Sequence, residues 1–355
     1  ILHYYCCGYD WFVNKFYRAD MLATPYLFCL NRSGIDRIDL TNYNSSMSTV
    51  PVFENSAEIT MEDSWVSDMY VNATSKQTYF ITGNTRVTDD GPGNFKGTNV
   101  SDIFTGTLTS TYNRVDINGK KALFNLTTNN RDVYCLYVDD QSNTDATDDI
   151  IFAGAENGLH IITHNELAGT ASLLPTTQKA GPSTNQLENK VTSLFLVSKT
   201  TQGNNTMYSF VATVHGMGLY RLDCVRNTSN LIFTTITWTL LSTNVTGINQ
   251  GTPQGCSQSE PYLIPKFTKC LPVFNGQNIA GYYITNEINL EKLCTGRQAN
   301  YFTGVYYCPA DIDGFPDAGG LKPLTVWQGG NDWGWNATKP AANINGALIT
   351  PENTL

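Results

Sequence analysis

Five segments of this chain repeat one pattern: a run rich in β-forming residues, then a polar turn, then a run of alternating polarity. Helical periodicity is nearly absent, because no window of about twelve residues keeps apolar positions at i, i+3, i+4 and i+7. The pattern therefore predicts an all-β fold built from repeated hairpins. The five segments are residues 26–40, 78–90, 149–163, 207–224 and 279–294, and a sixth candidate with an Asn-Gly turn is 115–128.

The turns of these segments recur at intervals of roughly 35 to 75 residues, which indicates a degenerate repeat. The segment IFAGAENGLHIIT (151–163) resembles the inner hairpin of an extracellular or NHL-like β-propeller blade. In that resemblance, Gly154 and Ala155 permit close packing near a central channel, and Asn157-Gly158 adopts the positive φ of the turn. The resemblance implies a β-propeller, and six blades fit the six segments. A pair of tandem β-sandwiches is the alternative, because short strands with turn signals are typical of them too.

The two ends of the chain depart from the hairpin pattern. We therefore expect an aromatic, cysteine-bearing segment at 1–25, a propeller domain at 26–308 and an irregular tail at 309–355. The tail carries Trp327, Trp333 and Trp335, which we expect to latch it onto its own domain or to contact a protein or glycan partner. A strand-competent stretch at 344–350 favours self-association by strand addition to a neighbouring copy.

The charge balance argues against two classes of partner. Only 15% of the residues are charged, the net charge is -9 and no Lys/Arg cluster occurs, so nucleic acid is not an expected partner. No run of about 18 apolar residues is present, so no membrane insertion is expected. A charge-poor chain rich in Asn, Thr, Ser and Tyr is typical of a secreted or cell-surface protein.

The nine cysteines are dispersed, and none of them form the C-x-x-C spacing of a zinc or redox site. We therefore expect structural disulfides, with the intervals 256–270 and 294–308 suited to local loops and the pairing left open. The odd count leaves at least one thiol free or paired with another chain. The candidates are Cys6, Cys7, Cys29, Cys135, Cys224, Cys256, Cys270, Cys294 and Cys308.

Nine N-x-S/T sequons predict N-glycosylation if the source is a eukaryote. Several lie in polar stretches that read as turns, where a glycan remains in water. The acceptors are Asn31, Asn44, Asn72, Asn99, Asn125, Asn204, Asn227, Asn244 and Asn336.

The sharpest local motif is DIDGFPD at 311–317. It resembles the calcium loops of thrombospondin type 3 repeats, and by that match Asp311, Asp313 and Asp317 are the expected Ca²⁺ ligands. The sequence departs from those repeats because Ala310 stands where a further Asp is usual and the motif occurs once. An acidic turn without metal is the alternative.

A second acidic segment, 139–149, has no central glycine, so a solvated loop is expected there. The four histidines are His3, His160, His164 and His215; His160 and His215 fall at or beside the repeated hairpins, and a hydrogen-bonded structural role is expected for them. Linear motifs for a nucleophile elbow, a metalloprotease, a P-loop or a dinucleotide site are missing. We therefore expect a non-catalytic structural or adhesive glycoprotein. A calcium-dependent, lactonase-like propeller hydrolase and a carbohydrate-binding protein are the alternatives.

Overall fold

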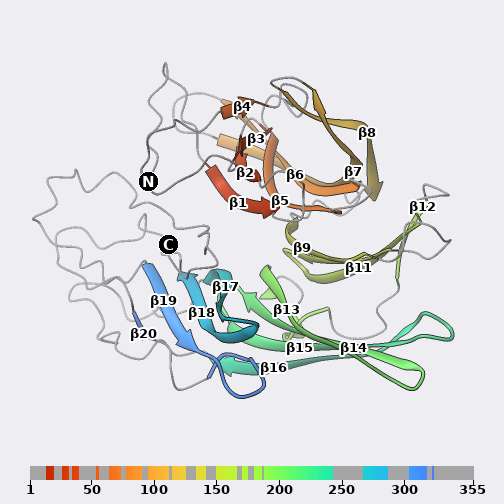
Figure 1. The fold of residues 1–355 in the computed structure, drawn as a ribbon, viewed down its shortest axis with the longest axis vertical. Helices are drawn as coiled ribbons and strands as arrows, with labels where there is room; N and C mark the ends of the chain where they lie inside the picture. The colour runs from red at the N-terminus through yellow and green to blue at the C-terminus, as the bar shows by residue number, and fades with distance from the viewer. Residues whose placement is uncertain are drawn as a thin grey trace, which may run out of the picture. The chain divides into compact units, whose positions relative to one another are not determined.

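The computed structural model of the chain describes somewhat more than half of it. Within the described residues the chain forms twenty β-strands and no α-helix (Figure 1). None of these residues belongs to a helix that could cross a membrane. The described residues are 13–19, 26–31, 34–39, 53–55, 64–72, 77–89, 95–111, 114–124, 133–140, 149–165, 170–174, 180–185, 188–242, 267–286, 304–317 and 322–323.

The strands form five four-stranded sheets, and in each sheet every strand is bonded to the next along the chain. The contacts divide the chain into two compact units. Unit 1 comprises residues 1–156 and 160–175, and unit 2 comprises 157–159 and 176–355. Each unit is described by itself.

Unit 1 contains three of the sheets. The first consists of β1 (Val13–Ala19), β2 (Tyr26–Asn31), β3 (Gly34–Asp39) and β4 (Phe53–Asn55). The second consists of β5 (Ser64–Val71), β6 (Gln77–Asp89), β7 (Phe95–Thr111) and β8 (Arg114–Phe124). The third consists of β9 (Val133–Asp139), β10 (Asp149–Ala155), β11 (Gly158–Asn165) and β12 (Thr170–Leu173).

Unit 2 contains the other two sheets. The fourth consists of β13 (Val191–Gln202), β14 (Asn205–Val214), β15 (Gly218–Asn227) and β16 (Phe233–Ser242). The fifth consists of β17 (Phe267–Asn275), β18 (Asn278–Asn286), β19 (Gly304–Pro309) and β20 (Lys322–Pro323).

The first strand of every sheet carries a β-bulge near its start. Its register against the second strand skips one residue, and the five skipped residues are Asn14, Ser67, Tyr134, Thr192 and Thr268. A bulge bends a strand and increases its twist, so the five first strands share a local geometry that the sequence does not display as a motif. The degenerate repeat expected from the sequence is therefore a structural repeat as well.

Neighbouring sheets within a unit contact each other through these first strands. In unit 1, β1 packs against β5 and β5 against β9, and in unit 2 β13 packs against β17. Consecutive four-stranded meanders that meet along their first strands are the blades of a β-propeller. The prediction of an all-β propeller is confirmed, but the described residues form five blades rather than six.

The missing sixth blade has a physical explanation. The Asn-Gly pair expected to close a hairpin within 115–128 lies inside β8, which runs without interruption from Arg114 to Phe124. The register against β7 shifts between Thr105 and Thr107, so the Asn-Gly pair accommodates a bulge instead of a turn. The pairing of β7 with β8 instead begins at Thr111 and Arg114, which lie opposite each other.

Three of the predicted hairpins are confirmed and one is wrong. The segments 26–40, 149–163 and 207–224 form β2–β3, β10–β11 and β14–β15. Gly158 has the expected positive φ of 121°, and a Cβ at this position would meet the Ala180 backbone, whereas Asn157 has an ordinary φ. The turn expected within 78–90 does not form, because β6 continues as one strand from Gln77 to Asp89.

The domain limits expected at residues 25 and 308 do not coincide with the ends of sheets. Strand β1 lies within 1–25 and pairs with β2 of the first blade. At the other end, β19 runs to Pro309 and β20 lies at Lys322–Pro323. Strands β1 and β20 therefore lie within the segments expected outside the propeller, because neither sequence shows the alternating pattern of the other blades.

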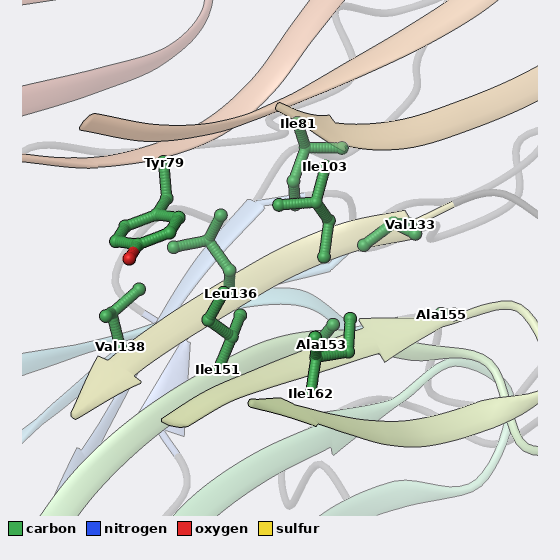
Figure 2. Packing of buried hydrophobic residues seen from close by; sticks show 10 residues of the cluster. All are labelled: Tyr79, Ile81, Ile103, Val133, Leu136, Val138, Ile151, Ala153, Ala155 and Ile162. Atoms are coloured by element: carbon green, nitrogen blue, oxygen red, sulfur yellow. The ribbon is translucent and has the colours of Figure 1, made fainter. Parts of the chain in front are cut away.

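An apolar core lies between the second and third blades of unit 1. Figure 2 shows Tyr79, Ile81 and Ile103 of the second blade facing side chains of the third. Another core joins the two blades of unit 2. Its buried members are Val211, Leu219, Phe267, Cys270, Tyr282, Ile284, Tyr306, Cys308 and Phe315.

Candidate functional site

A buried chain of three polar side chains joins the second and third blades. The Tyr79 hydroxyl in β6 donates a hydrogen bond to the Asp149 carboxylate in β10. The same hydroxyl lies 2.8 Å from Nδ1 of His164 in β11. A phenol has one proton and a carboxylate only accepts, so Nδ1–H of His164 donates to Tyr79. The order of donation is His164 to Tyr79 to Asp149.

These three side chains are of the types found in catalytic sites, but a substrate could not reach them. Tyr79, Asp149 and His164 are 0%, 2% and 3% exposed. The Tyr79 and His164 rings also meet edge to face, with centroids 5.6 Å apart. A reacting group must come within about 3 Å of its base, which burial of this degree prevents. The arrangement clamps two blades together.

The carboxylate of Asp68 forms a second link between these blades. Asp68 follows the bulge of β5 and is buried. Its Oδ1 accepts a hydrogen bond from Met69 N (2.9 Å), and its Oδ2 accepts one from Leu136 N in β9 (3.1 Å). Both oxygens therefore bind backbone N–H groups, one of them across the blade interface.

A third link is made by Asp140, directly after β9. Its Oδ2 accepts hydrogen bonds from the Tyr70 hydroxyl (3.2 Å) and from Nδ2 of Asn72. The prediction of a solvated acidic loop at 139–149 is therefore wrong at its two ends. Asp139 and Asp149 are buried because each begins or ends a strand that lies against another blade.

Unit 2 repeats the link of Asp68 at the equivalent position. Ser193 follows the bulge of β13, and its Oγ accepts a hydrogen bond from Cys270 N in β17 (3.3 Å). The bulge residue before it, Thr192, donates its hydroxyl proton to Phe267 O (2.8 Å). Cys270 stands two residues after the bulge of β17, as Leu136 does in β9. The same polar contact thus joins neighbouring blades in both units.

The acidic motif at 311–317 forms a compact turn. Oδ1 of Asp311 accepts hydrogen bonds from Asp313 N (3.0 Å) and Phe315 N (2.7 Å). Gly314 has a φ of 86°, which a side chain would rarely tolerate, and its carbonyl accepts the Tyr282 hydroxyl. Phe315 is buried, with the Arg221 guanidinium 4.4 Å from its ring centre. The Asp311 carboxylate and Gly314 together explain the motif as a turn.

The three expected calcium ligands do not converge in this turn. Among the described residues, no group of three or more His, Cys, Asp or Glu side chains is arranged to hold a metal ion. Asp311, Asp313 and Asp317 are all exposed, and one oxygen of Asp311 is engaged with the backbone. Calcium binding at this loop stays a prediction.

Cys224, Cys270 and Cys308 are buried thiols in this structure, and the expected partners Cys256 and Cys294 lie outside the described residues, so the disulfides stay a prediction. Cys270 in β17 and Cys308 in β19 have β18 between them, about two strand spacings apart, which exceeds the reach of a disulfide. The Cys308 thiol instead donates to Asp317 O (3.1 Å). A buried cysteine of this kind packs as a small apolar side chain.

Burial also changes the acidity of these thiols. It raises the pKa of Cys308 from 9.0 to about 12, with the nearby Asp317 charge acting in the same direction. Burial likewise raises the pKa of Cys224, with a smaller effect of Asp223, and that of Cys270, with a smaller effect of Cys308. Protonated thiols of this kind are poor nucleophiles and poor metal ligands.

Three sequons have described side chains, and they differ in whether the acceptor nitrogen is available. Asn204 is exposed in the two-residue turn between β13 and β14. Asn227 is half-buried and uses Oδ1 to accept Ser229 N (2.9 Å) and Asn230 N (3.2 Å), so these contacts do not engage its Nδ2. Nδ2 of Asn72, in contrast, is bound to Asp140. Asn204 O also accepts Thr228 N (2.7 Å), so the first two sequons are neighbours.

The remaining predicted residues fall into three groups. Asn31, Cys29 and Asn99 lie in strands whose side chains are outside the described set, and Cys135 is buried in β9. His160 and His215 are partly buried beside their hairpins, with His215 N donating to Lys190 O (2.8 Å). The residues outside the described ranges are His3, Cys6, Cys7, Asn44, Asn125, Asp145, Asp148, Asn244, Cys256, Cys294, Trp327, Trp333, Trp335 and Asn336.

Sequence reasoning missed the polar links. Asp68, Tyr79 and Ser193 stand alone in strand patterns, and their partners are 68, 70 and 77 residues away. The sequence signal for such a link is a polar residue at a strand position where the alternation of apolar and polar residues predicts an apolar one. That signal identifies a buried polar group without naming its partner.

No protein-family model matches the sequence, and no curated relative was found for it. Among solved structures, the chain is similar to an exo-β-1,3-galactanase from Phanerochaete chrysosporium, with 8% identity and a TM-score of 0.40 over 89% of this chain and 64% of that one. An α-L-arabinofuranosidase from Clostridium thermocellum shows 11% identity and a TM-score of 0.38 over 88% and 93% of the two chains.

The Dos1 propeller shows 7% identity and a TM-score of 0.36 over 80% of this chain and 62% of that one. This chain therefore spans less than two thirds of the galactanase and of the Dos1 propeller. The activities named for the two glycoside-cleaving enzymes belong to those proteins.

Proposed function

We propose that this protein is a non-catalytic secreted or cell-surface glycoprotein whose propeller is a rigid platform for adhesion or for assembly into an extracellular structure. One observation carries the proposal: described polar side chains with the chemistry of a catalytic site are buried and used to join blades. Asp149 is bound by Tyr79, and Asp68 by two backbone N–H groups. Glycosidases need two carboxyl groups that flank a substrate, and these two do not fulfil that role.

The extracellular assignment is supported by composition and by sequons. Only 15% of the residues are charged, Asn204 is exposed, and the contacts of the half-buried Asn227 leave its Nδ2 unengaged at the same end of the fourth blade. The described cysteines do not support it, because three of them are thiols. Self-association through the tail and calcium at 311–317 belong to the proposal on the sequence alone.

The test uses the full chain secreted from a eukaryotic host. We expect no turnover of aryl glycosides, β-1,3-galactan, arabinoxylan or aryl lactones, with or without added Ca²⁺. Analytical ultracentrifugation is expected to show concentration-dependent assembly. Turnover that disappears in a carboxylate variant would overturn the proposal in favour of a propeller hydrolase. Monomeric protein that binds selectively to a glycan array would favour a carbohydrate-binding protein.

A further inference from the structure

Among the described residues, no anionic side chain pairs with one buried cation of the fourth blade. Arg226 in β15 is 9% exposed, and its Nε is buried with no hydrogen-bond acceptor. Arginine keeps its charge at every pH that a folded protein tolerates. A buried charge is costly unless it is paired, and an unsatisfied buried donor calls for an absent ion or ligand.

The strand geometry fixes the surroundings of Arg226. It pairs with Thr206 of β14 and with Phe233 of β16, and cross-strand partners project from the same face of a sheet. Thr206 and Phe233 are themselves buried. The register between β15 and β16 shifts beside Arg226, so Thr234 is skipped and a bulge lies next to the guanidinium. Bulges of this kind redirect side chains next to binding sites.

Acidic residues of the same strand do not supply the missing charge. Asp223 projects from the opposite face, because it is three residues from Arg226 in an extended strand. Its carboxylate is already bound by Nε of Arg221 (2.8 Å) and by the Ser209 hydroxyl (2.5 Å). Arg221 therefore has the partner that Arg226 lacks.

The face that carries Arg226 holds further groups suited to an anion. Lys199 lies over the Tyr208 ring, with Nζ 5.5 Å from the ring centre, and Tyr208 pairs with Cys224 on the same face as Arg226. The Thr201 and Thr206 hydroxyls are 3.1 Å apart in the row of Arg226. Two cations and two hydroxyls thus occupy neighbouring positions at this end of the blade.

We propose that Arg226 is the centre of a binding site for one oxyanion, a carboxylate or a sulfate group, of the kind that acidic carbohydrates carry. The guanidinium would present Nε–H and one Nη–H side by side, which matches two oxygens of such a group. The Tyr208 and Phe233 rings, with centroids 6.2 Å apart, would pack against the body of the ligand. This site is independent of the proposed platform function.

The probes are sodium acetate, sodium sulfate and sodium glucuronate, each compared with sodium chloride at equal ionic strength. Binding is measured on the full chain by titration calorimetry and by the shift in Tm. The variant Arg226→Met keeps the apolar stem and removes the charge. Arg226→Lys keeps the charge and removes the two-point contact. Arg221→Met is the matched control, because it changes an arginine of the same strand on the opposite face.

The wild type is expected to show a saturable rise in Tm that Arg226→Met removes and Arg221→Met retains. Arg226→Lys should bind at least tenfold more weakly. Sulfate stabilises many proteins without binding, so the effect counts only as the difference from Arg226→Met in the same salt. Tenfold tighter binding of glucuronate than of acetate assigns the site to an acidic sugar, and equal affinity assigns it to a free oxyanion. Identical titrations of the wild type and Arg226→Met would overturn the proposal.

Discussion

Oδ2 of Asp68 and the backbone N–H of Leu136 lie 3.1 Å apart and join the first strands of two neighbouring blades. In unit 2, Ser193 and Cys270 make the same contact at equivalent positions. Each acceptor follows a bulge, and each donor stands two residues after the bulge of the next first strand. The contact is a repeat feature of the blade, although the acceptor is a carboxylate in one case and a hydroxyl in the other.

Replacing Asp68 with alanine should destabilise unit 1. The change leaves the N–H groups of Leu136 and Met69 without their acceptors in a buried place, which typically costs about 1–3 kcal/mol. Urea unfolding measures the difference in the free energy of unfolding. Asp68→Asn is the control, because its amide oxygen can still accept from one N–H and should lose less. Equal losses in the two variants would show that the negative charge, and not the hydrogen bond, is what matters.

Tyr79→Phe removes one oxygen atom and keeps the ring in the apolar core. It leaves Asp149 and Nδ1 of His164 without their shared partner, so a loss of about 1–3 kcal/mol in stability is expected. The double variant with His164→Phe should lose less than the sum of the single losses, because the groups form one chain. Additive losses would contradict the coupling of Tyr79 and His164 in one hydrogen-bonded group.

The fold was predictable to the level of blades because alternation and turn residues are local signals. The hairpin at 149–163 formed as expected, since Gly158 occupies a position that requires positive φ. The Asn-Gly pair at 118–119 misled because a bulge uses the same permissive residues as a tight turn. Strand β1 was missed because its sequence, VNKFYRA, does not alternate cleanly.

The candidate site was less predictable than the fold, because its contacts join residues far apart in sequence. The sequence predicted that Asp149 lies in a solvated acidic loop, because no residue near it in the sequence indicates its hydrogen bond with Tyr79. The disulfides were predicted from the dispersed spacing of the cysteines and from the expected extracellular location, and neither indicates which strands lie next to each cysteine. Cys270 and Cys308 are kept apart by β18, which only the sheet order reveals.

The buried thiols predict a loss of stability at alkaline pH. The pKa of Cys308 is about 12 in the folded protein against 9.0 for an ordinary thiol, and burial also raises the pKa of Cys224 and Cys270. The unfolded chain therefore releases protons that the folded chain keeps. The contribution to stability is complete below pH 9 and is lost as pH rises towards 12.

Urea unfolding at pH 8, 9 and 10 tests this expectation. The free energy of unfolding should fall above pH 9, and the fall should be smaller in Cys308→Ala, which has no thiol to titrate at that position. Protein treated with a reductant before unfolding should behave in the same way. An unchanged slope in the variant would show that Cys308 titrates alike in both states.

Glycan occupancy should follow the availability of the asparagine nitrogen. In protein secreted from eukaryotic cells, we expect glycans at Asn204 and Asn227 and none at Asn72, whose Nδ2 is bound to Asp140. Glycopeptide mass spectrometry measures the occupancy of each site. Asn204→Gln and Asn227→Gln should each remove one glycan without changing the far-UV spectrum. A glycan at Asn72 in folded protein would show that the Asp140 contact is dispensable.

The turn at 311–317 separates two roles for its aspartates. Asp311 closes the turn through Oδ1, whereas the exposed Asp313 contributes its backbone N–H to that contact. Without calcium, Asp311→Ala should lower Tm, because Phe315 N loses its acceptor, and Asp313→Ala should leave Tm nearly unchanged.

If calcium binds as the resemblance to thrombospondin type 3 loops implies, Ca²⁺ raises the Tm of the wild type and both variants abolish that rise. If the loop is only an acidic turn, Ca²⁺ and a chelator give the wild type the same Tm, and the two variants differ from each other under both conditions. The comparison of Asp311→Ala with Asp313→Ala therefore decides between a metal site and a turn. Only if both aspartates bind the same Ca²⁺ ion do the two variants have the same effect on the Ca²⁺-dependent rise in Tm.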